Sequence, residues 1–410
     1  MLQIKVILML INVMKFGGTS VANLNRIKKV SQIIKKKLIN KNQKALVVVS
    51  AMSGVTNNLV EEFSRLQIDI NDPEYDSILS TGEQYSSSLM SLVLSKSGLK
   101  SRSLLGWQIP IETDSNYSRA RIKKINSKRI LELFRKFDVL IVAGFQGISD
   151  DNRITTLGRG GSDTSAVALA TSVKADLCEI YTDVEGIFTS DPRIVRSAKK
   201  IKNITYEEIL EMSSSGSKVL HPRSVELAMK YGIKIHVRST FSEKLGTMVV
   251  KEEKKLEKEI VTGISVSDNE ANVSLKGIPD KPGIAGEIFS LLSEANINVD
   301  MIVQNITDDG RYASLTFTVP VEDCSRSVVV LKNSKMKFKQ IKFDKNICKV
   351  SIVGVGMKSN VGVAKTMFET LAKKNINIKV ISTSEIKISV LIDSSKKRIA
   401  LNALHKAYKL

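Results

Sequence analysis

The chain has 410 residues, of which 42% are hydrophobic and 25% are charged. This length suits two or three domains, and the proportions exclude a disordered, collagen-like or mostly membrane-embedded chain. The formal net charge of +20 raises the possibility of nucleic-acid binding, but the basic residues are spread in short runs without interleaved aromatic residues. We therefore expect a solvated basic surface.

Three cysteines, Cys178, Cys324 and Cys348, are widely spaced and match no disulfide or metal-ligand pattern, which favours a reducing cytoplasm. The first residues are apolar around 7–11 but lack the basic region and cleavage site of a signal peptide. We expect a buried first strand there. No later segment offers about 20 uninterrupted apolar residues, so no membrane-spanning helix is expected.

Short apolar strands alternate with helix-like stretches over residues 1–248. Candidate strands at 45–49, 139–143 and 179–182 each meet a polar or glycine-rich turn. This alternation predicts an α/β domain with a largely parallel sheet. Ligands of such sheets bind beyond the carboxyl ends of the strands, and the three motifs below occupy those turns.

The first motif, Val-Met-Lys-Phe-Gly-Gly-Thr-Ser at 13–20, ends the first expected strand. Gly17 and Gly18 would let the backbone approach phosphate oxygens closely, and Lys15 is the natural partner for a phosphate. Taken alone, the segment could equally be a tight turn beside a surface lysine.

The second motif, Thr-Leu-Gly-Arg-Gly-Gly-Ser-Asp-Thr-Ser at 156–165, leads into a helical run. Arg159, Ser162 and Asp163 converge with three glycines on one helix N-terminus, which favours anions through its free N–H groups and its dipole. Arg159 can hold a carboxylate with a bidentate fork. Asp163 could instead be an ordinary helix cap, although capping does not require so many glycines.

The third motif, at 180–193, begins at a strand end and finishes in an Asp-Pro-Arg turn. It supplies polar groups, an aromatic ring and an arginine. Such a loop could hold an adenine ring and contact polyphosphate, but a surface hairpin would contain the same turn residues.

A highly charged stretch at 249–261 indicates an exposed linker. After it, residues 273–299 and 350–378 resemble each other, and each predicts a strand, a glycine-containing turn, an amphipathic helix and another strand. We expect two small α+β modules. Gly354 and Gly356 suggest a dinucleotide loop in the second copy, but that signal is too short to support one.

Taken together, the motifs KFGGTS, SAM at 50–52, GRGGSDTSA and YTDVEGIFTSDPR resemble the amino-acid kinase family and, within it, the aspartate kinases. The resemblance continues through 216–223 into paired ACT modules that end at 380–386. It implies an α/β amino-acid-kinase fold with a largely parallel central sheet, followed by two ferredoxin-like α+β ACT modules. The implied boundaries are a catalytic domain at 1–248, a charged linker at 249–261 and ACT modules at 262–342 and 343–410.

The resemblance also implies an activity, the ATP-dependent phosphorylation of the β-carboxylate of L-aspartate to 4-phospho-L-aspartate. This reaction begins the biosynthesis of lysine, threonine and methionine. The implied catalytic residues are Lys15 and Asp163, and the implied phosphate-binding residues are Lys15, Gly17, Gly18, Gly160 and Gly161. Aspartate would contact Thr56, Glu83, Arg159 and Ser162. ATP would contact Ser50, Thr182, Asp183, Phe188, Arg193 and Lys218.

The chemistry agrees with this inventory, because a β-carboxylate with a pKa of about 3.9 is already ionised at neutral pH and needs no general base. We therefore expect structural roles for His221, His236 and His405. Catalysis would need in-line alignment and neutralisation of charge on the moving phosphoryl group. The Mg²⁺ that accompanies ATP usually binds through phosphates and waters, so no protein ligand is predicted for it.

The ACT modules imply feedback inhibition by lysine, threonine or both, and a homo-oligomer with or without a separate ACT-only subunit. The residues implied to bind an effector could instead only end strands and turns, in which case the modules would serve as a dimer interface. The implied effector-binding residues are Asp280, Ala285, Ile297, Gln304, Asn377, Ser384 and Glu385.

Alternative functions stay open at this point. Family members on the same scaffold phosphorylate glutamate derivatives, carbamate or UMP, and the chain could also be an inactive amino-acid sensor. Nucleic-acid binding rests on net charge alone, and we expect neither nucleic-acid nor membrane partners. Lys15 lies several residues later than is usual in the family, so Met9 could be the true start in place of Met1.

Overall fold

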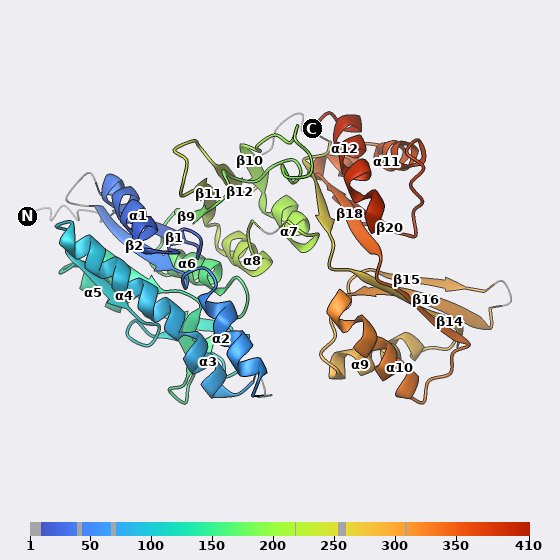
Figure 1. Cartoon of the computed structure of the whole chain (residues 1–410), viewed down its shortest axis with the longest axis horizontal. Helices are drawn as coiled ribbons and strands as arrows, with labels where there is room; N and C mark the ends of the chain where they lie inside the picture. Colours follow the sequence, from blue (N-terminus) through green and yellow to red (C-terminus); the bar gives the residue numbers. More distant parts are fainter. Residues whose placement is uncertain (1–9, 39–42, 67–70, 218, 253–259, 308–309) are drawn as a thin grey trace, which may run out of the picture. The chain divides into compact units, whose positions relative to one another are not determined.

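The computed structural model describes residues 10–38, 43–66, 71–217, 219–252, 260–307 and 310–410. They form two compact units, drawn with their helices and strands in Figure 1. The first unit comprises residues up to 187 together with 200–210 and 218–254, and the second comprises 188–199, 211–217 and residues from 255 onward. Residues 253–259, the centre of the expected linker, lie outside the described residues, as do residues 1–9 and Lys218.

An eight-stranded sheet in the order β10-β12-β11-β9-β1-β2-β6-β3 forms the centre of the first unit. Every neighbouring pair in it is parallel except β11 with β12. The expected largely parallel sheet is therefore confirmed. Its strands are β1 (Leu10–Phe16), β2 (Gln43–Val49), β3 (Ser101–Leu104), β6 (Val139–Ala143), β9 (Leu177–Thr182), β10 (Asn203–Thr205), β11 (Lys234–Ser239) and β12 (Thr247–Val250).

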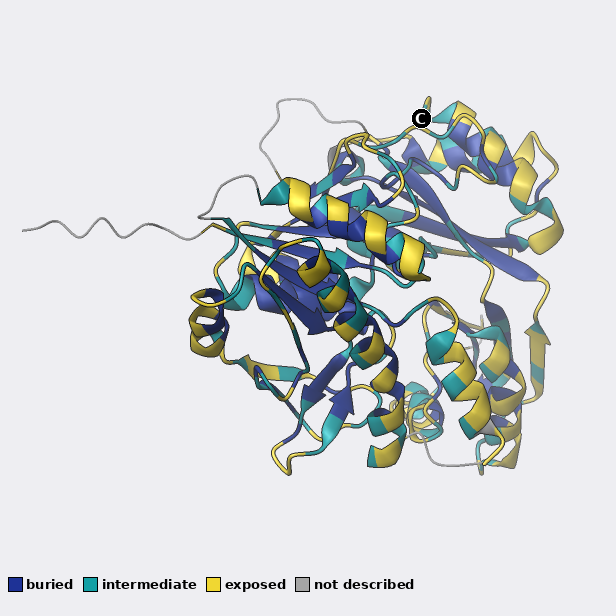
Figure 2. Ribbon diagram, turned by 60° about the vertical axis from the view of Figure 1, so that its left-hand side comes forward, coloured by how far each residue is buried: buried dark blue, intermediate teal, exposed yellow. Residues whose placement is uncertain are grey.

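Continuous apolar runs explain why β2 and β6 are interior strands of this sheet. Residues 45–49 and 139–143 are fully buried, as expected for parallel strands covered on both faces. Figure 2 shows the sheet strands largely in the colour of buried residues, while the helices that cover them are exposed on their outer sides.

Helices α1 (Leu24–Lys37) and α4 (Thr81–Lys96) pack on one face of the sheet, in a core that includes Met14 and Phe16 of β1. Because successive side chains of a strand point to opposite faces, Lys15 points to the other face. Helix α6 (Gly161–Ser172) contacts β1, β2 and β9, and packs against α8 (Pro222–Tyr231). The sheet thus places Lys15 on the same side as the N-terminus of α6.

Shorter elements complete the first unit. A small sheet has the order β5-β4-β7-β8. The elements of this region are α2 (Val55–Ser64), α3 (Pro73–Leu79), β4 (Ile111–Thr113), β5 (Ile122–Ile125), α5 (Ser127–Phe134), β7 (Gln146–Ile148) and β8 (Ile154–Thr156). Helix α7 (Tyr206–Ser214) contributes residues to both units.

The second unit contains the two expected α+β modules, each with a four-stranded antiparallel sheet. The first sheet has the order β15-β16-β14-β17 and the second the order β13-β18-β20-β19. The strands are β13 (Gly263–Ser267), β14 (Ala271–Pro279), β15 (Ile302–Ile306), β16 (Tyr312–Val319), β17 (Gln340–Asp344), β18 (Ile347–Val353), β19 (Val380–Thr383) and β20 (Lys387–Asp393). The helices are α9 (Ile284–Glu294), α10 (Cys324–Asn333), α11 (Val363–Ala372) and α12 (Lys397–Ala407).

The sheets of the second unit do not follow the order of the chain. Strand β13 lies in the expected first module at 262–342, yet it pairs with β18 of the second sheet from Gly263 to Ser267. The strand pairing therefore crosses the expected border between residues 342 and 343. The domain boundaries themselves stay predictions.

Candidate functional site

Lys15 and Asp163 form the centre of the candidate site. Lys15 is the last but one residue of β1, and Asp163 lies in the first turn of α6. The Lys15 Nζ atom is 2.6 Å from the Asp163 Oδ1 atom, and the two side chains are only 12% and 11% exposed. Because water is largely excluded, this ion pair is screened less than a surface pair would be. The structure thus brings together the two residues predicted to be catalytic.

The glycine turn after β1 lies directly beside the Lys15 ammonium. A Cβ atom on Gly17 would lie 3.5 Å from Lys15 Nζ, while one on Gly18 would lie only 2.8 Å from the carbonyl oxygen of Ala51. The Gly17 N–H donates to the carbonyl of Tyr181 at 3.2 Å, which ties the turn to β9. Gly18 is therefore required by packing, whereas Gly17 borders the ammonium group with bare backbone.

Two glycines at the N-terminus of α6 are also required by their surroundings. Gly160 has a φ of +68° and precedes the helix, and a Cβ atom there would lie 2.2 Å from the ring of His221. A Cβ atom on Gly161 would lie 2.7 Å from the ring of Phe145. Because these rings lie so close, there is no room for a side chain at either position. Both positions are therefore glycine, and no side chain of residue 160 or 161 covers the backbone.

The predicted aspartate-binding residues lie around this centre. Glu83 is in the first turn of α4, and one of its oxygens accepts the Ala51 N–H at 2.9 Å. Burial raises the pKa of Glu83 to about 7, although the hydrogen bond from Ala51 and the nearby Lys15 ammonium oppose the shift. Glu83 Oε2 is buried and has no hydrogen-bond partner among the described residues.

The other three predicted aspartate-binding residues differ in exposure. Ser162 is buried at the start of α6 and packs closely against Gly144. A Cβ atom added to Gly144 would lie only 2.9 Å from the Ser162 side chain. Thr56 is half-buried in the first turn of α2, and Arg159 is exposed just before α6. An exposed arginine beside an anion-favouring helix end is available to a carboxylate ligand from solution.

Three members of the predicted ATP-binding set lie at this edge of the sheet within the first unit. Ser50 directly follows β2, and its N–H donates to the carbonyl of Phe16 at 3.1 Å. Thr182 ends β9, and its hydroxyl donates to Asp183 at 3.2 Å. These three residues lie at the ends of β2 and β9, the two neighbours of β1 in the sheet. Lys218 lies outside the described residues.

Phe188 and Arg193 belong to the second unit. Arg193 makes a two-pronged ion pair with Asp191, whose carboxylate oxygens lie 3.0 Å from its Nε and 2.8 Å from its Nη2. The segment 188–199 packs within the second module, where the Thr189 hydroxyl is 2.9 Å from His405 Nε2. Burial lowers the pKa of His405.

Two charged residues that sequence reasoning missed hold the glycine-rich turn. Asp76 of α3 accepts hydrogen bonds from both the N–H and the hydroxyl of Thr156. Arg223 of α8 donates to the carbonyl of Leu157 at 2.7 Å. A fully buried aspartate within a short helix is an unusual feature, but nothing in the sequence indicates its partners.

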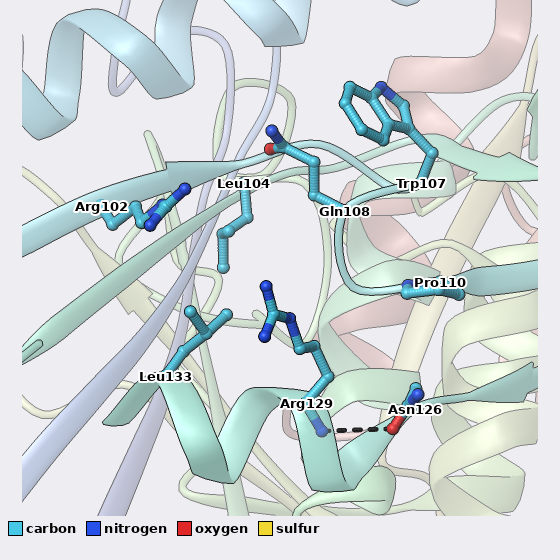
Figure 3. Close-up of a pocket in the computed structure, with 8 residues that line it drawn as sticks. All are labelled: Arg102, Leu104, Trp107, Gln108, Pro110, Asn126, Arg129 and Leu133. Carbon is cyan, nitrogen blue, oxygen red and sulfur yellow. Dashed lines mark hydrogen bonds between the residues drawn. The ribbon is translucent and has the colours of Figure 1, made fainter. Parts of the chain in front are cut away.

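A pocket of about 450 Å³ lies elsewhere in the first unit, beside the edge strand β3. Figure 3 shows the Arg129 side chain extending into it from α5, where the Arg129 N–H also donates to the Asn126 side chain at 3.2 Å. None of the predicted site residues lines this pocket. It is lined by Arg102, Leu104, Trp107, Gln108, Pro110, Asn126, Arg129 and Leu133.

The predicted effector-binding residues all lie in the second unit. Asp280 and Ala285 flank the turn between β14 and α9, and Ile297 is buried in the core of the first module. Gln304 is on β15, which contacts β19 of the second module. Three further residues, Asn377, Ser384 and Glu385, are exposed on either side of β19.

No group of three or more His, Cys, Asp or Glu side chains in the described ranges is arranged to hold a metal ion. No described helix has the length and apolar character to cross a bilayer. The three cysteines are buried free thiols.

Comparison with known proteins identifies the family. The model of the amino acid kinase family matches residues 11–239, and two ACT domain models match residues 273–332 and 350–408. An aspartokinase of Helicobacter pylori is 48% identical over 97% of this chain and 99% of its own. An aspartate kinase of Stutzerimonas stutzeri, named Ask_LysC, is 46% identical over 97% of both chains.

A solved structure shows the same architecture. The structure of E. coli aspartokinase III in complex with aspartate and ADP matches with a TM-score of 0.81 and 25% identity, over 97% of this chain and 99% of that one. The chain therefore belongs to the amino acid kinase family, and its relatives over nearly the whole length are aspartokinases. The expected kinase fold followed by two ACT modules is confirmed.

Proposed function

We propose that this chain transfers the γ-phosphoryl group of ATP to the β-carboxylate of L-aspartate and releases 4-phospho-L-aspartate and ADP. The observation that carries the proposal is the buried Lys15–Asp163 pair, 2.6 Å apart beside a bare glycine turn. Relatives that match nearly the whole chain are named aspartokinases, and the E. coli neighbour is described with aspartate and ADP. Together these findings favour aspartate over the other acceptors used on this scaffold.

The reaction needs alignment and charge neutralisation more than proton transfer. An oxygen of the ionised β-carboxylate attacks the γ-phosphorus while the bond to the ADP oxygen breaks, so no proton has to be removed from the nucleophile. In our proposal the Lys15 ammonium stabilises the phosphoryl oxygens, and the bare backbone at 17–18 and 160–161 lets these oxygens approach closely. Asp163 holds the ammonium in position through their ion pair.

The substrate end of the site would recognise both charges of the amino acid. Arg159 would bind a carboxylate of aspartate with its fork of N–H donors, and the ionised Glu83 would accept from the ammonium group. Glu83 suits this role because its Oε2 is buried without a hydrogen-bond partner among the described residues. Thr56 and Ser162 would complete the contacts.

Mg²⁺ fits this site as an ion that accompanies ATP. It is usually held by phosphate oxygens and waters with one or two carboxylates, and Asp163 is one carboxylate of the site that could contribute. The ion would supply neutralisation of phosphate charge. Thr182, Asp183 and Ser50 would contact the nucleotide at the strand ends, and Phe188, Arg193 and Lys218 stay predicted contacts.

The acceptor test decides the proposal. Purified protein with Mg-ATP would be offered aspartate, glutamate, N-acetylglutamate and UMP, with ADP release followed by a coupled assay and the acyl phosphate trapped by hydroxylamine. We expect turnover with aspartate alone. Turnover with another acceptor and none with aspartate would refute the substrate assignment, and no turnover at all would favour the inactive sensor.

We further propose that the ACT modules make this activity sensitive to lysine, threonine or both. A second E. coli aspartokinase III structure is described with lysine and aspartate, and it matches with a TM-score of 0.76. The exposed residues Gln304, Ser384 and Glu385 offer polar and acidic groups to an amino acid. We also propose a homo-oligomer assembled through the ACT modules.

A further inference from the structure

Asp76 and Arg223 carry opposite charges, lie on different helices, and bind the same two stretches of chain. One stretch is 118–120, which leads into β5. The other is 156–158, which begins the glycine-rich turn before Arg159. The stretches lie side by side, because the Ala120 N–H donates to the Thr156 carbonyl at 2.9 Å.

Asp76 binds both stretches through one carboxylate that is fully shielded from solvent. It accepts the Ser118 N–H at 2.9 Å, the Thr156 N–H at 2.6 Å and the Thr156 hydroxyl at 2.7 Å. Burial raises the pKa of Asp76, and the bonds from Ser118 and Thr156 oppose that shift. A carboxylate buried this deeply depends on such donors, and the N–H groups in turn have it as their acceptor.

Arg223 binds the same two stretches from α8. Its Nη1 donates to the Leu157 carbonyl at 2.7 Å and its Nη2 donates to the Ala120 carbonyl at 2.6 Å. Burial lowers the pKa of this guanidinium. A planar fork can serve two separate carbonyls in a fixed geometry, which the single ammonium of a lysine cannot reproduce.

We propose that Asp76 and Arg223 form a clamp that fixes the glycine-rich turn and thereby sets the position of Arg159. Both side chains are occupied by protein groups, so they act as positioning residues for the aspartate substrate. The inference rests on the proposed function, in which Arg159 binds aspartate. Its consequence is selective for the glycine-rich turn, because loosening the clamp displaces Arg159 together with the backbone at 160–161, while Ser50 and Thr182 stay at the ends of their own strands.

Steady-state kinetics would test the clamp. We expect Asp76→Ala to raise the KM for aspartate at least about 10-fold, with the KM for ATP changing less than about 2-fold. Asp76→Asn should restore most of the affinity, because its oxygen can accept both N–H groups while its amide donates to the Thr156 hydroxyl. Arg223→Lys should raise the KM for aspartate to an intermediate value.

Asp72→Ala is the matched control, because Asp72 caps the same helix by accepting the Glu74 N–H at 2.8 Å. It should leave both KM values unchanged. Amide hydrogen exchange gives a readout independent of activity. The amides of 156–161 should exchange faster in Asp76→Ala than in the wild type or in Asp72→Ala.

Two results would overturn the clamp. One is an unchanged KM for aspartate and unchanged exchange at 156–161 in both Asp76→Ala and Arg223→Lys. The other is an equal rise of both KM values with exchange increased throughout the unit, which would mean general loss of stability. If the wild-type protein does not phosphorylate aspartate, the proposed function fails, and the exchange experiment still decides whether the clamp holds the turn.

Discussion

The Glu83 carboxylate accepts a hydrogen bond from the Ala51 N–H at 2.9 Å and is otherwise buried within reach of the Lys15 charge. This placement raises its pKa to about 7, with burial as the main cause. A carboxyl group in that range changes its charge near neutral pH. The charge of Glu83, and with it the binding of a cationic substrate group, therefore depends on pH.

We expect the KM for aspartate to fall as the pH rises from about 6 to 8, because only the ionised Glu83 pairs with the substrate ammonium. In Glu83→Gln this pH dependence should vanish, and the KM should stay at least about 10-fold higher. The KM for ATP, measured over the same pH range, is the control. A variant that keeps the wild-type pH profile would remove Glu83 from the aspartate site.

Glu83→Gln should also change stability in a pH-dependent way. The folded state raises the pKa of Glu83 from 4.5 to about 7, so the stability that this group contributes is present at low pH and is lost as the pH rises through 7. The free energy of unfolding of the variant, relative to that of the wild type, should therefore rise by about 2 to 3 kcal/mol between pH 5 and pH 8. Chemical denaturation at several pH values measures this. A constant difference would contradict the raised pKa.

Lys15→Ala should lower turnover at least about 100-fold while the protein stays folded, because the ammonium acts on charge that develops in the transition state. The same loss is expected for Asp163→Ala. Lys44→Ala is the matched control, since Lys44 is also on the central sheet and pairs with Asp138 at 2.9 Å, but lies at the start of β2. Circular dichroism would monitor folding. Full activity of Lys15→Ala would refute the site assignment.

The two glycines after β1 should respond differently to alanine. In Gly18→Ala the new Cβ would lie 2.8 Å from a backbone oxygen of Ala51, so the turn must shift, and we expect a loss of about 1 to 3 kcal/mol in the free energy of unfolding. In Gly17→Ala the Cβ would lie 3.5 Å from Lys15 Nζ, an ordinary contact. That variant should keep its stability but bind ATP more weakly. Equal thermal stability of the two variants would contradict this packing.

Much of the catalytic fold could be predicted because its signals are local. The apolar runs at 45–49 and 139–143 determine buried strands, and the motifs that follow strands fall at one edge of a parallel sheet. The resemblance to the aspartate kinases implied a shared role for Lys15 and Asp163, and the sequence places them at a strand end and at a helix start. Such features depend on residues that are neighbours in the chain.

The parts that sequence reasoning missed depend on distant neighbours. Asp76 is 80 residues away from Thr156, and Arg223 is 103 residues away from Ala120. Nothing local in either segment specifies these partners. The pairing of β13 with β18 is likewise fixed only when the sheet forms, because any exposed edge with a matching apolar pattern could accept that strand.

The last prediction concerns control by amino acids. If the ACT modules bind an effector, activity at subsaturating aspartate should fall when lysine, threonine or both are added. The expected coupling between the effector pocket and the substrate sites is about 1 to 3 kcal/mol, or roughly 5- to 150-fold in affinity. Gln304→Ala should weaken the effect of either amino acid, and Glu385→Ala should weaken that of lysine most, because a carboxylate pairs with the side-chain ammonium.

Asn305→Ala is the matched control, since Asn305 is the next exposed residue of β15 and points to the opposite face. Rates that stay constant with millimolar lysine and threonine, added separately and together, would refute the regulatory proposal while leaving the kinase assignment intact.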